Sequence, residues 1–184
     1  MRITGGQSKG RLLLPLKGLN IRPSSDKIRE TIFNIVGQDM TGMKVLDLFA
    51  GTGSLGIEAL SRGALNALFI DNSIQSISLI KKNLKLIDYE QVGFVLKKDL
   101  YKGLPVEHPF LQERLNFVFM DPPYGKGLIS RLLEKIVRGD ILATDAIIIT
   151  ESSKNDKITI NSKELRHHDS RIYGETKLDI FDKR

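Results

Sequence analysis

Short apolar runs alternate with segments of helical periodicity along most of this 184-residue chain. The runs predict strands, and the periodic segments between them predict helices. The expected strands are residues 45–49, 67–71, 92–97, 115–121 and 145–151. The expected helices are residues 54–62, 74–87 and 127–138. Because short strands with few polar interruptions alternate with helices, the pattern predicts an α/β fold with a doubly wound parallel sheet covered on both faces.

The two ends of the chain depart from this alternation. Near the N-terminus, residues 2–4 and 11–14 flank a glycine-rich turn region, which is a pattern compatible with a β-hairpin. Residues 24–36 then carry a helical apolar stripe that begins at two serines able to cap a helix. Near the C-terminus, residues 172–174 and 177–181 are typical of an antiparallel strand pair.

The composition fits a soluble globular domain and excludes several other classes of protein. The hydrophobic share of 41% and the charged share of 27% argue against disorder, a coiled coil or a disulfide scaffold. We expect no membrane span and no secretory signal, because no apolar run is long enough and the first residues are not apolar. The absence of cysteine favours a reducing cytoplasm. The three histidines have no metal-ligand spacing, so we expect no metal site.

Nearly all of the excess positive charge lies ahead of the first strong strand. Residues 1–36 hold seven basic and two acidic side chains, a net charge of +5, whereas the rest of the chain has a net charge of +1. Concentrated positive charge suits contact with phosphate, although a solvated basic face is the alternative interpretation. The candidate nucleic-acid contacts are Arg2, Lys9, Arg11, Lys17 and Arg22. The last of these could instead lie near a cofactor.

The tetrapeptide Asp121-Pro122-Pro123-Tyr124 ends an apolar run with a carboxylate, a stiff turn and an aromatic ring. A planar amino nitrogen has a delocalised lone pair, so it attacks an electrophile only when acceptors hold its N–H groups. Asp121 and the Pro122 carbonyl can hold those groups, and Tyr124 offers a stacking face. The motif therefore suits methylation of an amino nitrogen on a nucleobase or an amide. An ordinary strand-to-loop turn is the alternative.

A glycine-rich turn follows the first strand of the alternation and opens a helix, which is where a cofactor is expected. Gly51, Gly53 and Gly56 match the G-x-G-x-x-G pattern of dinucleotide sites, and Asp71 lies 20 residues after Gly51. Asp47 argues against a dinucleotide, because a carboxylate ahead of the turn repels a pyrophosphate. The same carboxylate suits the ammonium and sulfonium groups of S-adenosylmethionine, which we expect as the cofactor.

Four acids follow four successive expected strands, and they should converge at the carboxyl edge of the sheet. They are Asp47, Asp71, Asp99 and Asp121. Asp71 suits the ribose hydroxyls of a cofactor, and Asp99 could accept from an adenine amino group. Each acid alone is more simply a helix cap or a turn residue. Their joint placement favours a cofactor site.

With these residues in hand, the chain resembles the RsmD family of bacterial 16S rRNA guanine-N2 methyltransferases almost from end to end. The segments that carry the resemblance are residues 1–6 with 9–11, 22–30, 47–53, 56–64 and 121–124, and Tyr173-Gly174 with Thr176 and Leu178. Ser24 stands where the family usually has threonine, and Lys27 where it has arginine. The clearest departure is Asp71 in place of glutamate, a shorter side chain that bears on cofactor affinity.

The resemblance implies a class I S-adenosylmethionine-dependent methyltransferase with a seven-stranded sheet, an antiparallel C-terminal strand pair and an N-terminal β-hairpin extension. Residues 1–24 would be a basic extension for RNA contact, and residues 25–184 the methyltransferase domain. The acceptor would be the N2 amine of a guanine in 16S rRNA of an assembling small ribosomal subunit, and S-adenosylhomocysteine the product. We expect a cytoplasmic monomer. The expected site residues are Asp121, Pro122 and Tyr124 for catalysis, and Asp47, Phe49, Gly51, Gly53, Asp71, Asp99 and Leu100 for the cofactor.

Four other functions remain open from the residues alone. A DNA adenine-N6 or cytosine-N4 methyltransferase would use the same chemistry, although one domain leaves little room for a module that reads sequence. A protein-glutamine methyltransferase typically has asparagine where Asp121 stands. A nicotinamide-dependent oxidoreductase is disfavoured by Asp47. A non-catalytic RNA-binding module would leave the cluster of acids unexplained.

Overall fold

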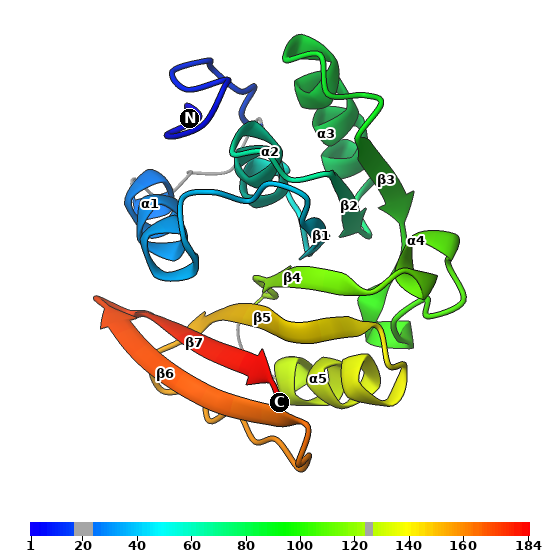
Figure 1. Ribbon diagram of the computed structural model, residues 1–184. Coiled ribbons are helices and arrows are strands. Elements are labelled where there is room, and N and C mark those ends of the chain that lie inside the picture. Colours follow the sequence, from blue (N-terminus) through cyan, green and yellow to red (C-terminus); the bar gives the residue numbers. More distant parts are fainter. Residues whose placement is uncertain (17–23, 124–126) are drawn as a thin grey trace.

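A seven-stranded sheet forms the centre of the molecule (Figure 1). The structure is a computed structural model, and it describes residues 1–16, 24–123 and 127–184. The strand order is β3-β2-β1-β4-β5-β7-β6. The strands are β1 (Lys44–Leu48), β2 (Asn66–Asp71), β3 (Gly93–Lys97), β4 (Leu115–Met120), β5 (Leu142–Ser153), β6 (Leu165–Tyr173) and β7 (Thr176–Lys183). The α/β fold with a terminal antiparallel pair is therefore confirmed.

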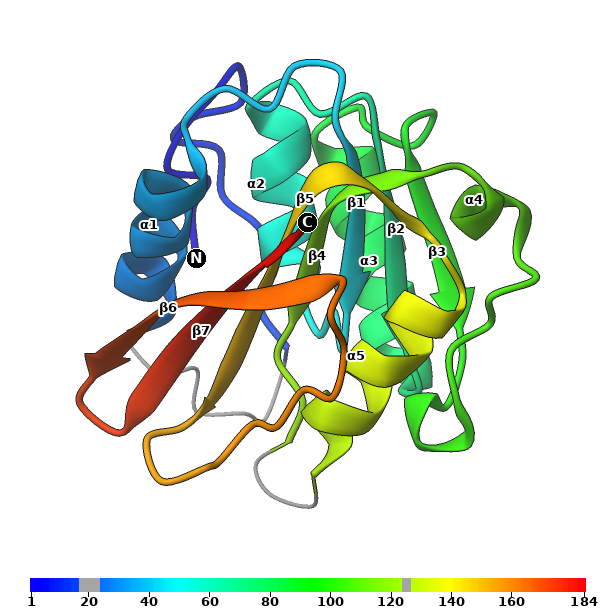
Figure 2. The same ribbon diagram turned by 60° about the horizontal axis from the view of Figure 1, so that its bottom comes forward.

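Helices cover both faces of the sheet (Figure 2). The helices are α1 (Ser24–Val36), α2 (Ser54–Ser61), α3 (Ile74–Leu86), α4 (Pro109–Gln112) and α5 (Leu128–Arg138), with a 3₁₀ turn η1 (Leu100–Lys102). Apolar side chains of α1, α2 and α3 share one core cluster with one face of the sheet, and those of α4 and α5 share a second cluster with the other face. Strands β1, β2 and β4 are buried almost throughout, as expected for central strands covered on both sides.

The carboxyl ends of the central parallel strands lie level with one another. Leu48 at the end of β1 pairs with Ile70 in β2 and with Met120 in β4. The residues that follow these three positions, Phe49, Asp71 and Asp121, therefore leave the sheet side by side. Register alone thus brings together the glycine-rich turn and the Asp-Pro-Pro segment, which are 70 residues apart in the sequence.

The last two strands distinguish this sheet from that of the ordinary dinucleotide-binding fold. Strand β7 runs antiparallel to its neighbours and lies between β5 and β6. The dinucleotide fold has strand order 3-2-1-4-5-6 with parallel strands, and so has no such insertion. The topology therefore argues against the nicotinamide alternative independently of Asp47.

The N-terminal segment turns back on itself, but it does not form two regular strands. A single antiparallel bridge joins Arg2 to Leu12. Backbone hydrogen bonds from Ile3 N to the Arg11 carbonyl, from Gly10 N to the Ile3 carbonyl and from Leu13 N to the Met1 carbonyl hold the two arms together. The backbone N–H of Thr4 donates to the Glu58 carboxylate, and that of Gln7 donates to the Ser61 carbonyl of α2. The expected hairpin is therefore present in a short, irregular form, because other backbone donors of the segment pair with α2.

Buried ion pairs fasten this segment and α1 to α2. Glu58 is fully buried, and its carboxylate accepts from Arg29 Nε at 3.2 Å, Arg62 Nη2 at 2.8 Å and Thr4 N at 2.9 Å. A buried charge is tolerated when it is paired and hydrogen-bonded, as here. Arg29 is only 2% exposed, so one of the basic side chains of the front segment serves packing and cannot contact phosphate.

In the described part of the chain, no helix has the length and apolar character that a membrane span requires.

Candidate active site

Three residues with positive φ shape the turn between β1 and α2. Phe49, Gly51 and Gly53 have φ values of 61°, 54° and 79°. Glycine adopts this left-handed conformation freely, whereas a phenylalanine there is strained, as is often found beside ligand sites. The N–H of Gly53 donates to the Ala50 carbonyl at 2.7 Å, which closes the turn. The helix then starts immediately at Ser54.

Gly56 allows α2 to lie close against the sheet. A Cβ atom at this position would stand 2.3 Å from Cε1 of Phe69, whose ring is fully buried in β2. The third glycine of the pattern therefore serves close helix–strand packing, the role that such a glycine has in dinucleotide folds as well. The glycine spacing by itself therefore does not tell one cofactor from another.

Asp47 lies beneath the turn, where it ties β1 to α2. Its side chain accepts the Gly56 N–H at 2.9 Å, and the residue is 3% exposed. Burial raises the pKa of Asp47 to about 7, against the lowering effect of the Gly56 hydrogen bond and with a smaller raising effect from the charge of Asp71. A nearby cation would favour the ionised form of this carboxyl group.

Asp71 braces the glycine turn from the end of β2. One carboxylate oxygen accepts the Gly51 N–H at 2.9 Å, and the other accepts the Ser73 N–H at 2.8 Å. Each oxygen of an ionised carboxylate has two acceptor positions, so both can still accept from ligand hydroxyls. The sequence indicated a ligand contact for Asp71, but it did not reveal that the residue also holds the turn in shape.

One cavity of about 400 Å³ joins the end of β2 to the end of β4. This volume falls within the range of roughly 300–1,000 Å³ that is typical of small-molecule sites. The lining residues are Phe49, Asp71, Asn72, Tyr101, Asp121, Pro122 and Pro123. The fold thus brings four residues of the expected site, Phe49, Asp71, Asp121 and Pro122, to the walls of a single cavity.

Other expected cofactor residues do not line this cavity as the structure describes it. Asp99 caps η1 by accepting the Tyr101 N–H at 3.0 Å, and Leu100 is 2% exposed within the apolar core. Gly51 and Gly53 form the turn beneath the cavity wall. Tyr124 lies outside the described residues.

Two lining residues were missed by the reasoning from sequence. Asn72 directly follows Asp71, so its position after a strand was a usable signal. Tyr101 lies in η1, a short element that hydrophobic periodicity does not reveal. An aromatic ring two residues after Asp99 was the only available sign of it.

Two of the candidate nucleic-acid residues, Lys9 and Arg11, are separated from this cavity. Lys9 is exposed near the N-terminal turn, and Arg11 contacts the Leu86 carbonyl and lies 3.6 Å from the Asp88 carboxylate, beyond the end of α3. This turn packs on the carboxyl end of α2, whereas the cavity lies at its amino end. An eight-residue helix is about 12 Å long, which gives the scale of the separation. Lys17 and Arg22 lie outside the described residues.

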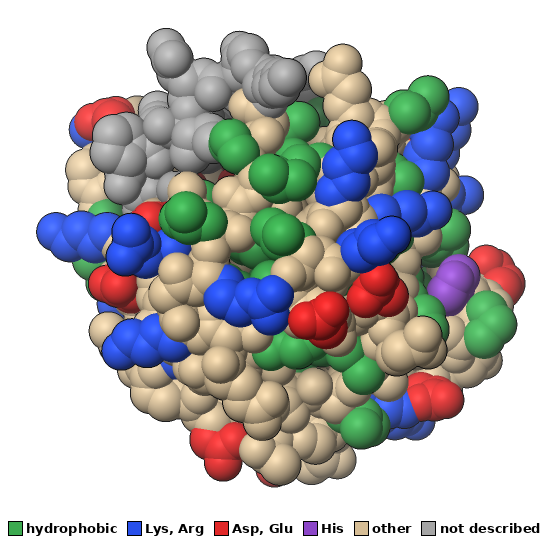
Figure 3. All heavy atoms as spheres, turned by 90° about the horizontal axis from the view of Figure 1, so that it is seen from above, with side chains coloured by type: hydrophobic (Ala, Val, Ile, Leu, Met, Phe, Trp, Pro, Cys, Tyr) green, Lys and Arg blue, Asp and Glu red, His purple; other side chains and the backbone are tan. Residues whose placement is uncertain are grey.

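The side of the molecule that carries the N-terminal turn, α2 and α3 is basic with apolar patches (Figure 3). In the N-terminal segment, Arg2, Lys9 and Arg11 are exposed, and so are Leu12 and Leu14 at 62% and 43%. Lysines of α3 add to the positive charge on this side.

Among the described residues, no group of three or more histidine, aspartate or glutamate side chains is arranged to hold a metal ion.

Comparison with known proteins gives consistent matches along the whole chain. The model of a family described as "Conserved hypothetical protein 95" matches residues 1–182. "Putative rRNA methyltransferase YlbH" of Bacillus subtilis is 35% identical over 186 residues, which cover 100% of both chains. "Ribosomal RNA small subunit methyltransferase D" of Escherichia coli is 30% identical over 189 residues, which cover 98% of this chain and 89% of that protein.

Solved structures also match this chain. The structure of yhhF from Escherichia coli has a TM-score of 0.81 and 30% identity, covering 100% of this chain and 97% of that one. An RNA methyltransferase of Salinibacter ruber, solved in complex with S-adenosyl-L-homocysteine, has a TM-score of 0.63 and 13% identity, covering 88% and 93%, and so shares the fold alone. On the match of the family and of these relatives, the chain belongs to the RsmD family of methyltransferases.

Proposed function

We propose that this protein transfers a methyl group from S-adenosylmethionine to the exocyclic N2 amine of a guanine in 16S rRNA of the small ribosomal subunit. The observation that carries the proposal is the cavity shared by Asp71 and Phe49, beside the glycine turn, and by Asp121 and Pro122. A donor at one end and an amino group at the other would lie within the same open cavity. Membership of the family and the names of its curated relatives support the rRNA substrate.

The residues at the glycine turn fit S-adenosylmethionine. The carboxylate of Asp71 has acceptor positions left for ribose hydroxyls after it has bound two backbone N–H groups. Tyr101 and Phe49 offer aromatic surface in the same cavity. When ionised, Asp47 supplies negative charge beneath the turn, which complements the cationic groups of the donor and would repel a pyrophosphate. When bound, this cofactor supplies an electrophilic methyl group on sulfur.

Asp121 and the carbonyl of Pro122 are assigned to the acceptor amine. By accepting its N–H groups they would orient the nitrogen lone pair toward the methyl group, and Tyr124 would stack on the base. Holding two reactants in attack geometry can contribute about 7–11 kcal/mol. Positive charge moves to the nitrogen as the methyl group transfers, so a carboxylate placed there stabilises the transition state. The amine becomes acidic only after alkylation, so Asp121 need not be a strong base beforehand.

We assign RNA binding to the basic extension of residues 1–24. The acceptor guanine must leave its helical stack to reach the cavity, which favours an unpaired or flipped nucleotide. Lys9 and Arg11 lie beyond the far end of α2. They would therefore bind phosphates of RNA distant from the flipped base rather than the phosphate of the flipped nucleotide. Such contacts give binding that weakens as salt concentration rises.

The test is to follow labelled methyl groups into candidate acceptors. The protein and labelled S-adenosylmethionine are incubated separately with unmodified small ribosomal subunits, bare 16S rRNA and DNA, and the modified nucleoside is identified after digestion. We expect N2-methylguanosine at one position of the rRNA. Label in adenine or cytosine of DNA would replace the proposal with the DNA methyltransferase alternative. Calorimetry with S-adenosylmethionine and NAD side by side separates the two cofactors.

A further inference from the structure

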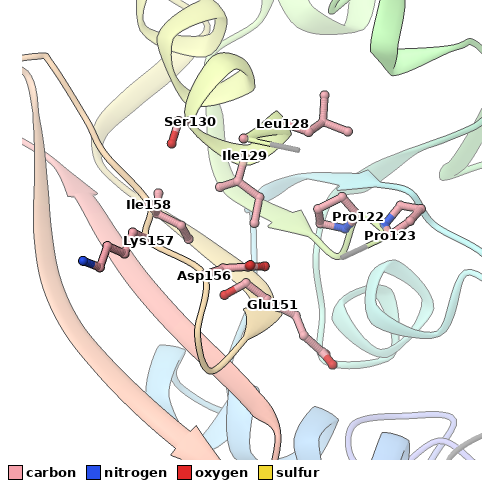
Figure 4. A pocket seen from close by; sticks show the side chains of 11 residues that line it. Pro122, Pro123, Leu128, Ile129, Ser130, Glu151, Asp156, Lys157 and Ile158 are labelled. Atoms are coloured by element: carbon pink, nitrogen blue, oxygen red, sulfur yellow. The ribbon is translucent and has the colours of Figure 1, made fainter. Parts of the chain in front are cut away.

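A second, smaller cavity of about 60 Å³ lies on the β5 side of the Asp-Pro-Pro segment (Figure 4). Pro122 and Pro123 line this cavity and the larger cofactor cavity as well. The two prolines are therefore a wall common to both. The remaining lining comes from the start of α5, the end of β5 and the loop that follows β5. The small cavity therefore lies on the β5 side of the prolines, whereas β2 lies at the other end of the larger cavity.

The lining of the small cavity combines apolar walls with two carboxylates. Ile129 and Ile158 contribute apolar side chains, and Asp156 and Glu151 contribute acidic ones. Figure 4 shows the Asp156 carboxylate directed toward the side of the cavity that holds the two prolines. The ammonium group of Lys157 points away from them in the same view. The Glu151 carboxylate also lies away from the prolines. Of the three charged side chains in the described lining, the one directed toward the prolines is therefore Asp156, a hydrogen-bond acceptor.

Asp156 is held in place by the sheet. Its carboxylate accepts the Ser153 N–H at 3.3 Å, and its backbone carbonyl accepts from Lys177 Nζ at 2.6 Å. The same ammonium group lies 3.1 Å from the buried carboxylate of Asp179 on β7. A half-buried lysine thus anchors the loop after β5 to the neighbouring strand. Groups fixed in this way are preorganised for recognition, since little ordering is left for the binding step.

We propose that the N1 side of the acceptor guanine faces the small cavity, while its N2 amine stays at Asp121 and the Pro122 carbonyl, and that Asp156 accepts the hydrogen on ring nitrogen N1. This assignment rests on the proposed function and deepens it. Guanine carries a hydrogen on the ring nitrogen next to its exocyclic amine, whereas adenine and cytosine carry a lone pair there. An ionised carboxylate accepts hydrogen bonds and donates none, so Asp156 would attract guanine and repel the other two bases.

The base analogue 2-aminopurine probes this interaction, because it keeps the amino group of guanine but has a bare lone pair at N1. It also lacks the O6 carbonyl of guanine, so the effect of Asp156 is obtained by comparing protein variants rather than the two bases alone. Subunits are reconstituted with either base at the nucleotide mapped by the labelling experiment. The kcat/KM ratio of guanine to 2-aminopurine is then measured for the wild type and for Asp156→Asn. The asparagine can still accept from Ser153 and can also donate to a bare nitrogen. We expect its ratio to be lower than that of the wild type by roughly 10- to 100-fold, the effect of one hydrogen bond to a charged group.

Glu164→Gln is the matched control, because it removes an exposed acid from the same loop outside the small cavity. Its ratio should equal that of the wild type. Unchanged melting temperature and unchanged affinity for S-adenosylmethionine will verify that Asp156→Asn is folded. An equal fall on both bases, or no change on either, leaves the ratio constant and would overturn the assignment to Asp156. A wild type that methylates no guanine at all would instead overturn the proposed function itself.

Discussion

Replacement of Asp47 by asparagine should remove the pH dependence that this buried carboxyl group imposes on stability. Asp47 is 3% exposed, and burial raises its pKa from 3.8 to about 7. A raised folded-state pKa means that the folded protein holds a proton that the unfolded chain releases. The contribution of the group to stability is therefore complete below pH 3.8 and is lost as the pH rises through about 7. The asparagine variant lacks this titration.

The size of the effect follows from the shift in pKa. The rise in the pKa of Asp47 from 3.8 to about 7 corresponds to roughly 4 kcal/mol of stability lost at pH 8, at about 1.4 kcal/mol per pKa unit. The asparagine can still accept the Gly56 N–H, but its own buried N–H groups cost about 1–3 kcal/mol if they find no acceptor. The wild type should thus be the more stable protein near pH 4. The variant should be the more stable one near pH 8.

Urea unfolding between pH 4 and pH 8 measures this difference. The free energy of unfolding of the wild type minus that of Asp47→Asn should fall by about 1.4 kcal/mol per pH unit up to neutrality and then level off. Asp140→Asn is a control of opposite sign, because hydrogen bonds from the Arg114 and Lys183 side chains lower the pKa of the exposed Asp140. Its stabilising contribution is present at neutral pH and is lost as the pH falls. A wild-type-minus-Asp47→Asn difference that does not change with pH would refute the reasoning.

Cofactor binding offers a second measurement on the same residue. A cationic donor near Asp47 favours its ionised form, so binding should release a proton when the pKa lies near neutrality. The affinity of the wild type for S-adenosylmethionine should therefore rise between pH 6 and pH 8. Calorimetry in buffers of different ionisation enthalpy counts the proton. Equal proton release by wild type and Asp47→Asn would assign the effect to another group.

Three further changes test other parts of the site. Asp121→Ala should lower the rate of methyl transfer by at least ~100-fold with cofactor affinity unchanged, and full activity would remove the residue from the mechanism. Lys9→Gln should weaken RNA binding and reduce the slope of log affinity against log salt by about 1, whereas the exposed Lys163→Gln should do neither. An equal salt slope for both would assign Lys9 to solubility. Gly56→Ala should lower the free energy of unfolding by about 1–3 kcal/mol, since its Cβ would meet the Phe69 ring; wild-type stability would show that the helix can move away.

Much of the fold could be predicted because its signals are local. Buried parallel strands appear as short apolar runs, so β1, β2 and β4 were expected within two residues of their observed bounds. The turn at Gly51 and Gly53 was expected because only a tight backbone path joins a strand directly to a helix. The convergence of acids at one edge followed from the common direction of parallel strands.

The sequence by itself determined which residues follow the carboxyl ends of the strands, but only the tertiary structure decided which of their side chains reach a cavity. Asp71 and Asp121 line it, whereas Asp47 turns under the loop to Gly56 and Asp99 caps η1. The position of Lys9 and the placement of Asp156 in a cavity beside the two prolines likewise depend on how distant segments pack. The hydrophobic periodicity of a helix or strand encodes which of its faces is buried, because the pattern involves only residues close together in the chain. The direction of a side chain beyond a strand depends on contacts from other elements, which no local pattern records.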